Sequence, residues 1–135
     1  MRAQVSLRAG AMLLAVGALA LPRAQAQTAP QLNTIQDVGR ALSACWVPPP
    51  LDKSRGGTQI TVLITFSRSG EVIGEPKFTY ITPGLPQEMR AAYQRSVADA
   101  ISRCSPMPFT PGLGAAVAGR PFAMRYDDTR GQKGA

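Results

Sequence analysis

Few side chains in this sequence are suited to catalysis, because it contains no histidine. Carboxylates, lysines and tyrosines remain as general bases, and the 8 acidic residues form no recognised catalytic spacing. Asp127 and Asp128 open a polar C-terminal segment that we interpret as a solvated tail, and Glu71 and Glu75 fit the solvent face of a strand. We therefore expect no enzyme. A hydrolase, the alternative, would need one of these carboxylates in a closed pocket.

The two cysteines, Cys45 and Cys104, allow three kinds of chemistry. A metal site would need further ligands and a reactive thiol would need a histidine base, and the chain supplies neither. The N-terminal segment described below predicts export, and an even number of cysteines in an exported chain favours a disulfide. We expect a bond between Cys45 and Cys104, with no metal and no cofactor.

Two further features could suggest a ligand. Gly112-Leu113-Gly114 resembles part of a phosphate loop, but it follows prolines rather than a strand and opens no predicted helix. Trp46 could anchor a ligand, although its position at the end of an apolar helical stripe favours a place in the core. Neither feature predicts a small-molecule substrate.

The N-terminal segment has the three parts of a secretory signal peptide. Arg2 and Arg8 precede an apolar run from Ala9 to Leu21, and Ala24-Gln25-Ala26 forms a cleavage site. The alternative, a retained membrane anchor, needs a longer apolar run of about 20 residues. We expect cleavage after Ala26 and a periplasmic location.

Charge gives little information about a partner. Without residues 1–26, 12 basic side chains face 8 acidic ones, a formal net charge of +4. The basic residues are spread singly rather than clustered, which argues against nucleic-acid binding. The surplus either serves solubility or steers the protein toward acidic partners or an anionic membrane surface.

The spacing of apolar residues predicts the elements that hold these side chains. Residues 33–46 have the pattern of one helical face, with Thr34 and Asp37 as a capping box. Strands 58–67 and 71–80 alternate around a turn at Arg68-Ser69-Gly70, with Pro76 marking a bulge or an outward-facing position.

The second half of the chain predicts three more segments. A second helix runs from Pro86 to Cys104, a loop of about 15 residues covers 105–119, and a third strand spans 120–126. Each cysteine ends the apolar stripe of its helix, so a disulfide would close a loop of about 60 residues and contribute about 4 kcal/mol.

Together these elements predict one α+β domain. We expect a three-stranded antiparallel sheet with two helices packed on one face, in the order α-β-β-α-β. The predicted boundaries are a signal peptide at 1–26, a linker at 27–32, the domain at 33–126 and a polar tail at 127–135.

This order of elements resembles the C-terminal domains of TolA and TonB over residues 33–126. The resemblance rests on Trp46-Val47-Pro48-Pro49 after the first helix, the Ser69-Gly70 turn, Ser105-Pro106-Met107-Pro108 after the second helix, and the closing strand. The cysteine pair is similar to the TolA-like branch, in which a disulfide joins the helices. Unlike those families, the chain has a predicted linker of only about six residues before the first helix, so we do not expect it to transmit force by itself.

The resemblance implies a protein-binding module that binds an envelope or outer-membrane-associated protein. The physical mode would be strand addition, in which a partner segment pairs with an exposed sheet edge. We expect this edge at the third strand of a meander, at Arg120, Phe122, Met124 and Tyr126. Two alternatives remain: the loop 105–119 protects the edge, or a structural envelope component self-associates through it.

Overall fold

The computed structural model describes Gly17 and residues 30–131. The rest of the predicted signal peptide, linker residues 27–29 and the last four residues of the predicted tail lie outside this part. The elements in chain order are α1 (Ile35–Ala44), a short 3-10 turn η1 (Leu51–Lys53), β1 (Gln59–Thr65), β2 (Lys77–Ile81), α2 (Gln87–Cys104), α3 (Pro111–Val117) and β3 (Pro121–Asp127). None of the described helices is long and apolar enough to cross a membrane. The fold is α+β, as the sequence predicted.

Helix α1 begins directly after Thr34, which forms a capping box with Asp37. The Thr34 hydroxyl accepts a hydrogen bond from the Asp37 amide, and the Asp37 carboxylate accepts one from the Thr34 amide, each at 3.1 Å. This reciprocal pair satisfies two amides that the first turn leaves free. The nearby Arg40 guanidinium, followed by backbone amides, lowers the pKa of Asp37. The predicted capping box is confirmed.

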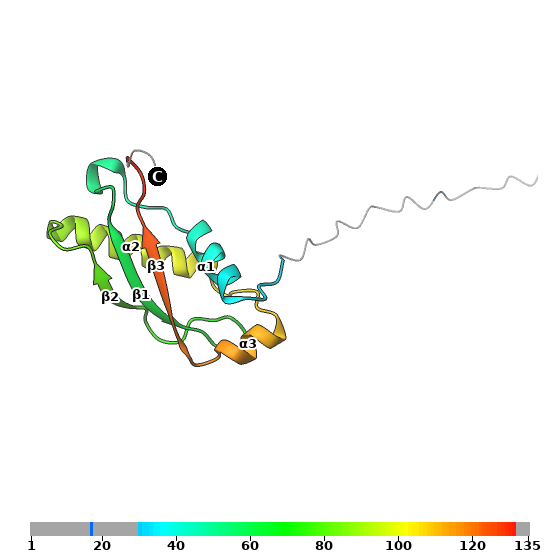
Figure 1. Cartoon of the computed structure of the whole chain (residues 1–135). Helices are drawn as coiled ribbons and strands as arrows, with labels where there is room; N and C mark the ends of the chain where they lie inside the picture. Colours follow the sequence, from blue (N-terminus) through cyan, green and yellow to red (C-terminus); the bar gives the residue numbers. More distant parts are fainter. Residues whose placement is uncertain (1–16, 18–29, 132–135) are drawn as a thin grey trace, which may run out of the picture.

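The three strands form one antiparallel sheet in the order β2-β1-β3 (Figure 1). The predicted meander order is wrong: β3 pairs with β1, because α2 and α3 intervene between β2 and β3 and return the chain to the far side of β1. The central strand β1 therefore has a partner on each side, and both β2 and β3 are edges within the described residues.

One face of the sheet carries the core. Ile60, Val62 and Ile64 of β1 are buried, and the adjacent core residues come mainly from α1, α2 and β3. Helices α1 and α2 lie on the same side of the sheet, and α2 crosses the strands in Figure 1. The opposite face has no helix over it among the described elements, and Ala123 and Arg125 are exposed there.

The hairpin between β1 and β2 is confirmed, but its second arm is interrupted. The Gly70 amide bonds to the Ser67 carbonyl at 3.0 Å and closes the turn. Only an isolated bridge, Phe66 with Val72, follows before β2 begins at Lys77. Gly74 has a positive φ of 68°, and Pro76 lies just outside the ladder, where its missing amide costs no strand hydrogen bond.

The predicted loop 105–119 contains the helix α3, so that prediction is wrong. The Thr110 hydroxyl caps the Leu113 amide at 3.3 Å, and Pro111 takes the first helical position, where a proline loses no bond. Two of its seven residues are glycine, which has a low helix propensity, so the sequence did not predict this helix. Gly114 is buried because its backbone lies against the Arg68 carbonyl, where a Cβ would overlap that oxygen.

The disulfide between Cys45 and Cys104 is present, with Cα atoms 6.0 Å apart. Cys45 caps the end of α1, and Cys104 is the last residue of α2, so the bond joins the C-terminal ends of both helices as predicted. Trp46 packs on the core with its ring against Tyr126 and donates a hydrogen bond to the Ser96 hydroxyl at 3.0 Å. Its predicted core role is confirmed.

Candidate protein-binding edge

Strand β3 is paired along its whole length on one side only. All seven residues, from Pro121 to Asp127, oppose β1 in a continuous register from Thr65 to Gln59. The described sheet has no strand beyond β3. An edge of this kind offers a partner a row of backbone donors and acceptors.

The direction of each backbone group on β3 follows from the bonds at its ends. The Asp128 amide donates to the Thr58 carbonyl at 2.8 Å, which shows that residue 128 faces β1. On the other side of β1, the Thr65 carbonyl accepts a hydrogen bond from the Ile73 amide, and the Gln59 carbonyl accepts one from the Thr82 amide. The backbone groups of the odd-numbered residues of β1 therefore face the β2 side, and those of the even-numbered residues face β3. Successive residues of a strand alternate in direction.

This alternation divides β3 into two sets. The backbone groups of Phe122, Met124 and Tyr126 face β1, whereas those of Ala123, Arg125 and Asp127 face outward. No hydrogen bond from another described loop or turn reaches the outward-facing amides. The outward set is therefore the part of the edge that can bind another chain.

The structure corrects the side-chain part of the predicted surface. Met124 and Tyr126 are 6% and 2% exposed, and Phe122 is half-buried, because these side chains enter the core beneath the sheet. Arg120 is exposed but precedes the strand. The alternating pattern correctly predicted the strand, but we expected its apolar side chains to form the contact surface. The exposed surface instead consists of the outward-facing backbone and the side chains of residues 123, 125 and 127.

The C-terminal end of β3 is fixed by Asp128, which the sequence placed in a solvated tail. Asp128 is only 2% exposed, and its side chain is buried like those of Met124 and Tyr126. Its carboxylate accepts hydrogen bonds from the Tyr93 hydroxyl at 2.6 Å and from the Arg130 guanidinium at 2.9 Å. The tail interpretation of this residue is wrong because charged and phenolic donors satisfy the buried carboxylate.

Arg130 extends this contact to the loop that precedes β1. Its guanidinium donates to the Pro49 carbonyl at 2.7 Å and to the Ser54 hydroxyl at 3.1 Å. Hydrogen bonds from Arg130, and then from Tyr93, hold the pKa of Asp128 below its ordinary value despite burial. We call Tyr93, Asp128 and Arg130 the C-terminal clasp.

The N-terminal end of β3 is anchored at the hairpin. The Gly119 amide donates to the Phe66 carbonyl at 2.9 Å, and the Met107 amide donates to the Gly70 carbonyl at 2.8 Å. The segment 105–119 is thus bonded to the hairpin and to Leu32, and none of its backbone hydrogen bonds goes to β3. The predicted protection of the edge by this segment finds no support in its hydrogen bonding.

The carboxylates considered for catalysis are engaged or exposed. Asp127 and Asp128 line a small open hollow of about 210 Å³. Asp127 forms an ion pair with Arg125, and Asp128 forms one with Arg130. Glu71 borders another open hollow, between the hairpin arm and α2, and both Glu71 and Glu75 are exposed. None of these four carboxylates lies in a closed pocket, the feature that would favour the hydrolase alternative.

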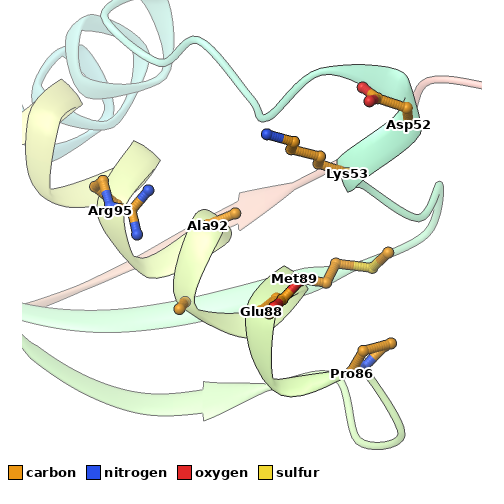
Figure 2. Close-up of a pocket in the computed structure, with 8 residues that line it drawn as sticks. Asp52, Lys53, Pro86, Glu88, Met89, Ala92 and Arg95 are labelled. Atoms are coloured by element: carbon orange, nitrogen blue, oxygen red, sulfur yellow. The ribbon is translucent and has the colours of Figure 1, made fainter.

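A further hollow, of about 520 Å³, lies between η1 and α2 (Figure 2). Figure 2 shows Lys53 from η1 across from α2, which contributes Glu88 and Arg95. These charged side chains are exposed and of both signs. The described residues contain no cluster of three or more metal-binding side chains. This hollow offers no buried polar group to orient a substrate.

Comparison with known proteins gives one match. A family model described as "Uncharacterised conserved protein UCP034077" matches residues 28–130. No curated protein and no solved structure matches the chain. The matched range includes the clasp residues through Arg130 and starts before α1.

Proposed function

We propose that this chain, which belongs to the family described as Uncharacterised conserved protein UCP034077, is a non-enzymatic protein-binding module of the cell envelope. A partner segment would add to the sheet at the outer edge of β3. The observation that carries this proposal is the outward row of amides at Ala123, Arg125 and Asp127 on a regular seven-residue strand.

The fixed ends of β3 support strand addition. The C-terminal clasp holds one end and the Gly119 bond to Phe66 holds the other. A pre-ordered edge loses little conformational freedom when a partner strand pairs with it, so more of the hydrogen-bond energy appears as affinity.

The helix, strand, strand, helix, strand order supports the same class of function through the resemblance to TolA and TonB C-terminal domains. The chain departs from that order by the insertion of α3. We place the module in the periplasm, and the disulfide supports this because such bonds persist in oxidising compartments. The partner would be an envelope or outer-membrane-associated protein.

The test is crosslinked capture from periplasmic extract under non-reducing conditions, comparing three forms of the protein. Ala123→Pro removes one outward amide without removing a bond to β1, whereas Ala123→Thr keeps the amide and changes only the side chain. We expect the wild type and Ala123→Thr to recover the same envelope protein. Ala123→Pro should recover at least about tenfold less, since a lost backbone pair costs about 1 kcal/mol and the proline ring blocks its neighbours.

Equal recovery by Ala123→Pro, with its fold verified by circular dichroism, would show that the partner binds elsewhere. Loss of recovery by Ala123→Thr alone would point to side-chain contact rather than strand addition. Recovery by none of the three forms would contradict the proposed partner.

A further inference from the structure

The outward face of β3 carries a charge pattern with one matching partner. Arg125 and Asp127 lie two residues apart on the exposed side of the strand, and both have outward-facing backbone groups. We propose that a second copy of this chain pairs antiparallel with β3, placing Arg125 opposite Asp127 of the second copy. This proposal rests on the proposed use of the β3 edge, which the second copy and the envelope partner would occupy in turn.

The register follows from antiparallel geometry. A strand that satisfies both charges must place a basic residue opposite Asp127 and, two residues later in its own direction, an acidic residue opposite Arg125. Read from its N-terminus, that strand has the order basic, any residue, acidic. The segment Arg125-Tyr126-Asp127 has this order itself, so this C-terminal segment of β3 is complementary to its own copy.

The same register aligns the backbone. Residues with outward-facing groups exchange both of their hydrogen bonds when they lie directly opposite each other in an antiparallel pair. Arg125 and Asp127 both belong to this outward set, and a twofold axis at Tyr126 relates the two contacts. The interface is then isologous, with the same patch used on both copies. The register centred on Arg125 would instead oppose two guanidinium groups.

The ion pair between Arg125 and Asp127 within one chain does not prevent these contacts between two copies. The Arg125 Nε lies 3.0 Å from an Asp127 carboxylate oxygen, and the two side chains are 59% and 38% exposed. Such an exposed pair contributes little to stability. A guanidinium also has terminal donors beyond Nε, so Arg125 can bridge its own Asp127 and that of the second copy.

Sedimentation velocity on the purified protein from about 1 μM to about 1 mM tests this proposal. The variants are Arg125→Asp and Asp127→Arg, each of which places like charges opposite each other twice in the symmetric pair. Each should weaken self-association at least about tenfold relative to the wild type. An equimolar mixture of the two variants should restore association, because the acidic edge of one matches the basic edge of the other.

A wild type that stays monomeric up to about 1 mM would overturn the proposal. So would single variants that associate as strongly as the wild type, or a mixture that stays monomeric when each variant is folded. Failure here would leave the proposed function separately testable, because capture of an envelope protein depends on the amide at Ala123 and not on this charge register.

Discussion

The two edges of the sheet differ in regularity. Strand β3 pairs with β1 through seven consecutive residues without interruption. Strand β2 has five residues, and its pairing with β1 shifts register between Thr61 and Val62. It also begins with the charged Lys77, directly after Pro76. Short length, an irregular register and a charged or proline residue are the features that protect edge strands from pairing.

The difference also lies in how each strand is held. The clasp fixes the C-terminal end of β3 through side chains outside the strand, which leaves its outer backbone free. At the end of β2, the Thr82 amide and hydroxyl bond to Gln59 of β1, so that connection stays within the sheet. An edge can therefore be rigid and open at once when distant residues anchor its ends.

Replacing an inward-facing residue of β3 should have the largest effect. Met124→Pro removes an amide that faces β1 and a buried side chain, so we expect at least about 3 kcal/mol of destabilisation. The matched change Ala123→Pro removes an outward amide and should cost about 1 kcal/mol or less. Urea unfolding of both variants measures the difference, and equal losses would contradict the assigned alternation.

Opening the clasp should have the next largest effect. Asp128→Ala leaves Tyr93 and Arg130 without their shared acceptor, and we expect a loss of about 3 kcal/mol in the free energy of unfolding. Asp127→Ala is the control, since its exposed pair with Arg125 should contribute less than about 0.5 kcal/mol. Similar urea midpoints for the two variants would show that Asp128 does not anchor the strand.

Two glycines of the hairpin, one at its turn and one in its second arm, should be replaced by alanine only at a cost in stability. Gly70 and Gly74 both have positive φ, at 86° and 68°, so alanine at either position should cost about 1 to 2 kcal/mol. A Cβ at Gly70 would also overlap the Met107 carbonyl, whereas nothing lies near one at Gly74. Gly70→Ala should therefore cost about 1 kcal/mol more in thermal unfolding. Equal costs would mean that the contact with Met107 gives way freely.

Acid should weaken the clasp. The pKa of Asp128 is lower in the folded protein than in the unfolded chain, so its contribution is fully present above the unfolded value and is lost as pH falls through the folded one. Urea unfolding between about pH 6 and pH 2 should show a smaller decline for Asp128→Asn than for the wild type. Parallel declines would assign the acid sensitivity to other carboxylates.

A change at Tyr126 should have the smallest effect. Its hydroxyl is buried without a hydrogen-bond partner among the described residues, and burial raises its pKa to about 12. Tyr126→Phe removes an unsatisfied group, so stability should stay equal or rise by up to about 1 kcal/mol. Tyr93→Phe, the control, removes the donor to Asp128 and should destabilise the protein. A clear loss for Tyr126→Phe would indicate a bound water at its hydroxyl.

Local patterns predicted most of the elements. Helical spacing and alternation located α1, α2, β1 and β3, because each buries one regular face. The pattern failed at α3, whose short helix depends on the Thr110 cap and on packing rather than on composition. It also failed at Asp128, because a carboxylate next to a polar tail gives no local sign that Tyr93, 35 positions earlier, will donate to it.

The sequence by itself determined the α+β class, the capping of α1 and the pairing of the two cysteines, because short-range periodicity and a count of two leave few choices. Only the tertiary structure decided that β1 is central and that Met124 and Tyr126 face inward. It also decided that the exposed part of β3 is its outward backbone. Strand order depends on which side of β1 the chain reaches after two helices, and that path is set by packing between residues far apart in sequence.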